Sequence, residues 1–78
     1  MNTHFMDAMD SSGHTKVTWD PEDKDSVKVA RETFTEMLKK GYQAFKILRT
    51  STEKKGERIQ TFDPMIGEIL LVPQLRGG

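Results

Sequence analysis

The chain has 78 residues, of which 35% are hydrophobic and 31% charged, so it forms one globular domain at most and lacks room for a full core plus a deep catalytic cleft. Twelve lysines and arginines balance twelve aspartates and glutamates, so no net field attracts nucleic acid or an anionic membrane surface. The chain contains no cysteine, no signal-peptide core and no apolar run of about 18 residues, which argues against thiol chemistry and membrane spans and predicts a cytoplasmic protein.

The first segment, residues 1–13, is MNTHFMDAMDSSG, and it is polar and ends in a Ser-Ser-Gly breaker. We expect a flexible N-terminal segment here, with one helical turn around Phe5, Met6 and Met9 as the alternative. Four potential metal ligands lie in or next to it: His4, Asp7, Asp10 and His14. Their spacing matches neither a helical face nor a known ligand pattern, so we expect no metal site.

The next segment, HTKVTWD at 14–20, is rich in residues that favour β-strands, and its apolar and polar side chains alternate. This pattern predicts a strand with Val17 and Trp19 on one face. The run Asp20-Pro21-Glu22-Asp23 predicts a helix that begins there or one turn later, near Asp25. Apolar residues then recur at helical spacing up to a stop at Gly41: Val27, Ala30, Phe34, Met37 and Leu38. This stripe predicts an amphipathic helix packed on the core.

The second half of the chain predicts three strands. YQAFKILR at 42–49 and RIQTFDP at 58–64 form a plausible antiparallel hairpin, with its tip at 54–56. After a turn at Asp63-Pro64, EILLV at 68–72 runs without alternation, as expected of a strand covered on both faces. The expected fold is therefore α+β: a two-layer domain over residues 14–73, with one helix packed on a small mixed sheet.

The last five residues, QLRGG at 74–78, follow a proline that cannot donate a ladder hydrogen bond, so we expect a flexible tail after Pro73. Two glycines without Cβ atoms make a slim end that can pass through a narrow channel and present its carboxylate to an enzyme. By chance alone a terminal Gly-Gly occurs in roughly one chain in 200, and expression vectors also leave glycine scars.

The final nine residues, LLVPQLRGG, resemble the end of ubiquitin and its relatives, whose last strand also runs into a Leu-Arg-Gly-Gly tail. The Val72-Pro73 step is similar to the end of the small sulfur carriers of molybdopterin and thiamine synthesis. The resemblance implies a β-grasp, ubiquitin-like fold in a prokaryotic or phage protein. That fold opens with a hairpin before the helix, whereas only 14–20 is an evident strand here unless residues 2–9 pair with it. Pro73-Gln74 also replaces the aliphatic-basic pair of ubiquitin.

The resemblance further implies a protein modifier. A ThiF-like adenylating enzyme would activate the Gly78 carboxylate with ATP and magnesium, and a conjugating enzyme could pass it to a target protein. Gly77 and Gly78 would thread and donate the acyl group, Arg76 would meet a partner carboxylate, and Leu75 would fill an apolar slot. The alternative is a sulfur carrier with a C-terminal thiocarboxylate, although Arg76 favours conjugation. In both cases the chain itself binds no cofactor or metal and is not an enzyme.

A small adaptor or inhibitor module that binds a partner protein is the other class of function. It would use a sheet face or edge, with aromatic anchors if they are exposed: Trp19, Tyr42 and Phe45. An adaptor would tolerate loss of Gly77-Gly78, whereas a modifier would not. An independent enzyme is disfavoured, because the acids near Asp20 are explained by helix capping and no nucleophile–base set or phosphate loop is present.

Overall fold

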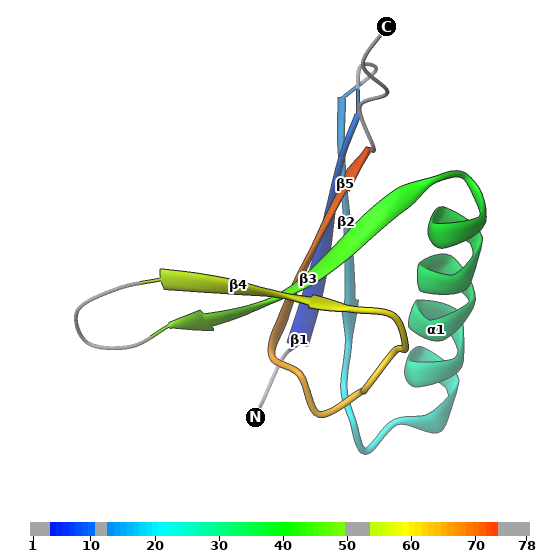
Figure 1. Ribbon diagram of the computed structural model, residues 1–78. Helices are drawn as coiled ribbons and strands as arrows, with labels where there is room; N and C mark the ends of the chain where they lie inside the picture. Colours follow the sequence, from blue (N-terminus) through cyan, green and yellow to red (C-terminus); the bar gives the residue numbers. More distant parts are fainter. Residues whose placement is uncertain (1–3, 11–12, 50–53, 74–78) are drawn as a thin grey trace, which may run out of the picture.

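The computed structural model describes residues 4–10, 13–49 and 54–73. In this part of the chain one helix packs on a mixed sheet (Figure 1), which confirms the expected two-layer α+β architecture. The elements are β1 (His4–Asp10), β2 (Gly13–Trp19), α1 (Lys24–Lys39), β3 (Tyr42–Arg49), β4 (Lys54–Ile59) and β5 (Glu68–Pro73). The strand order is β2-β1-β5-β3-β4, with β1 parallel to β5 and the other neighbours antiparallel.

Strand β1 differs from the expected flexible segment at 1–13. Residues 4–10 pair with β2 on one side and with β5 on the other, so the domain begins well before residue 14. Met6 and Ala8 point toward the helix and are buried, whereas Phe5 and Asp7 point to the opposite face. The segment is therefore ordered by pairing with a strand from the far end of the chain.

The helix begins one turn after Pro21, the later of the two expected starts. Asp23 is its N-cap, and its carboxylate accepts hydrogen bonds from the backbone N–H groups of Asp25 and Ser26 at 3.1 and 3.4 Å. Asp20 instead stabilises the preceding turn by accepting from the backbone N–H of Glu22 at 3.0 Å. At the other end the helix stops before Gly41, whose φ of 98° favours glycine.

Replacing Asp23 by alanine is expected to lower the free energy of unfolding by about 1 kcal/mol, because two N–H groups of the first turn lose their acceptor. Urea denaturation followed by far-UV circular dichroism measures this change. The control is Glu22→Ala, an exposed position one residue away, with an expected change below about 0.5 kcal/mol. Equal losses in the two variants would contradict a helix capped by Asp23.

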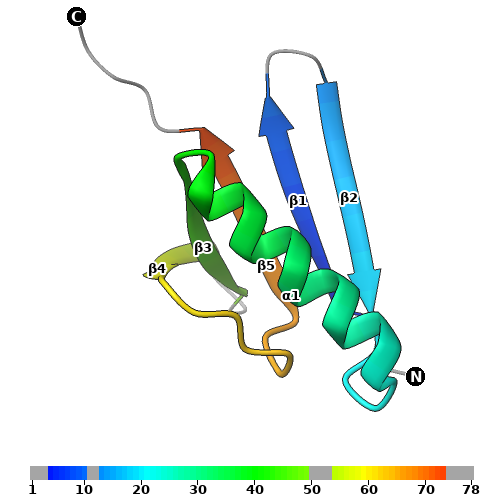
Figure 2. The ribbon, with the colours of Figure 1, turned by 90° about the vertical axis from the view of Figure 1, so that its right-hand side faces the viewer.

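The core lies between α1 and one face of the sheet, which the helix crosses (Figure 2). Its buried members are Met6, Ala8, Trp19, Val27, Ala30, Phe34, Ala44, Ile69 and Leu71. The expected helical stripe is confirmed, since Val27, Ala30 and Phe34 are buried and Met37 and Leu38 pack against them. Trp19 lies in this core, on the same face of β2 as Val17, as the alternation predicted.

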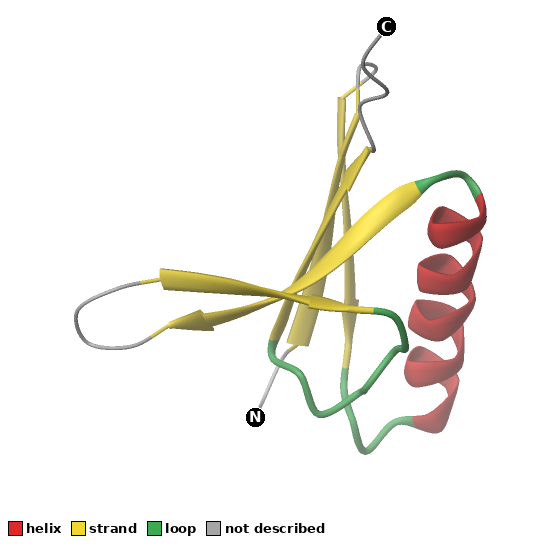
Figure 3. Cartoon of the chain, viewed as in Figure 1, coloured by secondary structure: helices red, strands yellow, loops and turns green. Residues whose placement is uncertain are grey.

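Strand β4 is earlier in the chain than predicted. It begins at Lys54, and its register places Gly56 opposite Ile47, so the expected hairpin tip at 54–56 is wrong. Residues 60–67 form a loop instead of the second half of that strand (Figure 3). Phe62 leaves the sheet because its ring packs on Trp19 and Phe34, at centroid distances of 5.0 and 5.7 Å.

Candidate functional site

No described element covers the face of the sheet opposite α1 (Figures 1 and 2), and several apolar side chains lie on this face. Leu70 lies at their centre, because the register places Leu70 between Asp7 of β1 and Phe45 of β3. We call these side chains the open-face patch; its members are Phe5, Met9, Phe45, Ile47, Leu70 and Val72. All are half-buried except Met9, which is 53% exposed.

This patch corrects the expectation that strand 68–72 is covered on both faces. Ile69 and Leu71 are fully buried under the helix, whereas Leu70 and Val72 stay half-buried on the open side. The apolar run of β5 therefore lines two different surfaces. Large apolar side chains gathered on a sheet face are typical of a protein-binding surface.

Charged side chains border the open-face patch. The Lys16 ammonium lies 4.6 Å from the centre of the Phe5 ring, a cation–π contact at the β1–β2 end. Arg58 of β4 is exposed and lies across from Phe45 at the other end. Two carboxylates also lie within the patch, because Asp7 is the cross-strand neighbour of Leu70 and Glu68 is that of Phe5.

The structure brings together two of the four side chains considered as metal ligands. His14 Nε2 lies 3.2 Å from Asp7 Oδ1, although this oxygen has no hydrogen-bond partner of good geometry. His4 points to the helix side, where its Nδ1 lies 2.8 Å from the Ile66 carbonyl oxygen; the side chain of Asp10 is outside the described part. Among the residues that the structure describes, no three His, Cys, Asp or Glu side chains form a metal-binding group.

The predicted tail residues Leu75, Arg76, Gly77 and Gly78 lie outside the described residues. The structure does place the point from which they continue. Strand β5 occupies the centre of the sheet and ends at Pro73, which pairs with Tyr42 just after the helix. Figure 2 shows this end of β5 beside the C-terminal end of α1.

The three suspected aromatic anchors lie in different places: Trp19 is in the core, Tyr42 packs against it, and Phe45 lies on the opposite face of the sheet. Trp19 is only 2% exposed, so it is a core residue and not a surface anchor. Phe45 belongs to the open-face patch, and Tyr42 is half-buried at the start of β3. Sequence reasoning missed Phe5 and Met9 as residues of a sheet face, because the segment His4–Asp10 shows no alternation of polar and apolar residues.

The described part of the chain contains one helix, and its 16 residues are too few and too polar to cross a membrane. Comparison with known proteins found no family model, no curated protein and no solved structure that matches this chain.

Proposed function

We propose that this chain is a ubiquitin-like modifier that acts in the cytoplasm and is conjugated through the carboxylate of Gly78. The observation that carries the proposal is the position of the last strand. Strand β5 is central in the order β2-β1-β5-β3-β4, and residues 74–78, which contain Leu-Arg-Gly-Gly, follow it directly. This order, with one helix on one face of the sheet, is compatible with the β-grasp fold that the tail resemblance implies.

The proposed chemistry takes place in a partner enzyme. A free carboxylate is a poor acylating agent, so the Gly78 carboxylate first attacks the α-phosphate of ATP and releases pyrophosphate, with magnesium held by the partner. A partner thiolate or the amine of a target protein then displaces AMP and forms a thioester or an isopeptide bond. Arg76 and Leu75 supply charge and apolar contact for recognition, while Gly77 and Gly78 thread into the enzyme.

The test is intact-mass and peptide-mapping spectrometry of the protein purified from its native host. A peptide in which Gly78 is linked to a lysine of another protein supports the modifier. Sulfur in place of one carboxylate oxygen at Gly78 instead identifies the sulfur carrier. A free acid as the sole species, from cells in which the protein carries out its biological role, contradicts both.

The second candidate function is an adaptor that binds a partner protein through the open-face patch. The specific observation in its favour is the position of Leu70, which is half-buried between Phe45 and Asp7 on a face that no described element covers. A few residues near the centre of an interface carry most of the binding energy in protein complexes. A modifier can also use this face, so the tail distinguishes the two functions.

Replacing Leu70 by lysine is expected to weaken capture of a partner by about tenfold or more, because a charge then occupies the centre of the patch. Asp7 lies opposite and offsets part of the new charge, so we expect a stability loss of only about 1 kcal/mol. Affinity purification with quantitative mass spectrometry compares the variant with wild type. The control is Val29→Lys, which places the same charge at an apolar helix residue that is 57% exposed. Equal capture by all three proteins would exclude the adaptor.

A further inference from the structure

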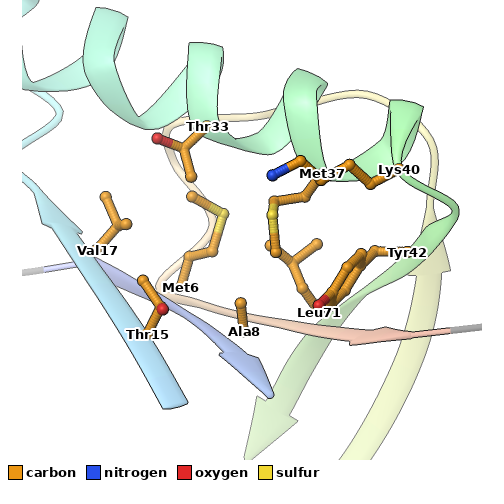
Figure 4. A pocket seen from close by; sticks show the side chains of 9 residues that line it. All are labelled: Met6, Ala8, Thr15, Val17, Thr33, Met37, Lys40, Tyr42 and Leu71. Atoms are coloured by element: carbon orange, nitrogen blue, oxygen red, sulfur yellow. The ribbon is translucent and has the colours of Figure 1, made fainter. Parts of the chain in front are cut away.

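A pocket of about 170 Å³ lies between the C-terminal half of α1 and the β1–β2 side of the sheet (Figure 4). Ala8 forms its floor, because this small side chain sits between Thr15 and Leu71 in one cross-strand row. Thr33 and Met37 border the pocket from the helix. The pocket is on the helix side of the sheet, so it is separate from the open-face patch and independent of the proposed tail chemistry.

The interior of the pocket is apolar, whereas its mouth is polar. Met6 and Leu71 are almost completely buried, and Figure 4 shows the side chains of Met6, from the sheet, and Met37, from the helix, pointing toward one another. Thr15 and Lys40 contribute a hydroxyl and an ammonium, and the Lys40 side chain bends over the pocket from the end of α1. This arrangement suits a small ligand with an apolar body and one polar group.

We propose that the pocket binds a small aromatic carboxylate, with its ring in contact with the thioethers of Met6 and Met37 and its carboxylate at the Lys40 ammonium. The size fits a single ring, since an engineered protein cavity of about 150 Å³ binds benzene. Thioether sulfur atoms make favourable contacts with aromatic rings, usually at the ring edge and about 5 Å away. Two methionines therefore favour an aromatic body over a short aliphatic one.

The charge at the mouth favours an anionic group. The Lys40 ammonium lies 3.9 Å from Glu36 Oε1, and these two side chains are 60% and 70% exposed. A pair this long and this exposed contributes little, so Lys40 can exchange it for a ligand carboxylate. A charge-assisted hydrogen bond between the ammonium and that carboxylate, at about 2.8 Å, is shorter and stronger than the present contact.

A two-dimensional ¹H–¹⁵N NMR titration of the full chain with benzoate tests the proposal. We expect saturable shifts at Ala8, Thr33 and Met37, and weaker binding of benzyl alcohol, which has the same ring without the charge. Lys40→Gln is expected to lower the affinity for benzoate about two- to fivefold, the range of an exposed ion pair. The matched control is Lys39→Gln, an exposed lysine that does not line this pocket, and it should leave the affinity unchanged.

Two variants that fill the pocket make the test decisive. Ala8→Leu fills it from the floor, and Thr33→Leu fills it from the helix, where leucine is a good helix former and a folded variant is expected. Both should abolish the saturable benzoate shifts. Three results would contradict ligand binding in this pocket. They are undiminished benzoate binding by Thr33→Leu, absence of saturable shifts in wild type, and shifts confined to the open-face patch. Equal binding of benzyl alcohol and benzoate would overturn the role of Lys40.

Discussion

Replacing Trp19 by alanine is expected to leave little folded protein at room temperature. Trp19 is 2% exposed and packs edge-on against Phe62, so its truncation opens a large cavity at an expected cost of about 3–5 kcal/mol. Its indole N–H also donates to the Pro64 carbonyl at 2.9 Å, and loss of this bond removes about 1 kcal/mol more. Domains are stable by only about 5–15 kcal/mol, and a domain this small belongs near the low end.

The variant Trp19→Phe separates the two contributions. Phenylalanine keeps most of the apolar contact with Phe62 but lacks the N–H, so we expect a loss of about 1–2 kcal/mol and a cooperative transition. Because Trp19 is the only tryptophan, unfolding is followed by far-UV circular dichroism and not by fluorescence. The control is Thr18→Ala, next to Trp19 on β2 but exposed and facing the opposite side. A stability of Trp19→Ala within 1 kcal/mol of Thr18→Ala would contradict a core position for the indole.

The hydrogen bond from Trp19 to Pro64 is one of three contacts that position the loop leading into β5. His4 Nδ1 lies 2.8 Å from the Ile66 carbonyl, Trp19 donates to the Pro64 carbonyl, and the backbone N–H of Phe5 donates to the Gly67 carbonyl at 3.1 Å. The loop at 60–67 is therefore held by side chains and backbone from β1 and β2. Loss of Trp19 should disturb the start of β5 as well as the core.

The elements that could be predicted from the sequence are those with a strong local pattern. Helix α1 has an apolar stripe at a spacing of three and four residues, and β3 and β5 are rich in aliphatic residues. Strand β1 has no such local signal, because Met6 and Ala8 alternate with Phe5 and Asp7 in a segment that reads as polar. Its burial depends on pairing with Ile69 and its neighbours, far along the chain.

Strand β4 shows a different limit of sequence reasoning. Lys54, Lys55 and Gly56 are poor strand formers, yet they pair with β3 in a continuous register. Phe62 fits a strand by composition, but the aromatic contacts with Trp19 and Phe34 draw it into the core. In both cases a tertiary contact outweighs local propensity.

The open-face patch could not be predicted because it needs the strand order. Leu70 and Phe45 become neighbours only when β5 pairs with β3, and Phe5 joins them only when β1 pairs with β5. The sequence instead predicted a tail site at residues 75–78, which depends on no tertiary contact. The open-face patch is therefore inferred from the strand order, whereas the tail site is inferred from the sequence alone.

Deleting Gly77 and Gly78 is expected to abolish covalent adducts of the protein in its native host while leaving the fold intact. The truncated chain ends at Arg76, whose side chain is too wide for a channel that accepts glycine. The described buried core runs from Met6 to Leu71, so we expect a change in unfolding free energy below about 0.5 kcal/mol. Intact-mass spectrometry measures the adducts, and urea denaturation measures the stability.

Two further variants make this result specific. Gly77→Val keeps the length and the carboxylate but adds a branched side chain, so it should also prevent adduct formation, whereas Gln74→Ala should preserve it. Persistence of adducts in the truncated protein would show that another residue carries them and would contradict activation at Gly78. Comparison with Leu70→Lys then separates the two functions: a modifier loses its adducts when the glycines are removed, whereas an adaptor keeps its partner after that deletion and loses it when Leu70 is replaced.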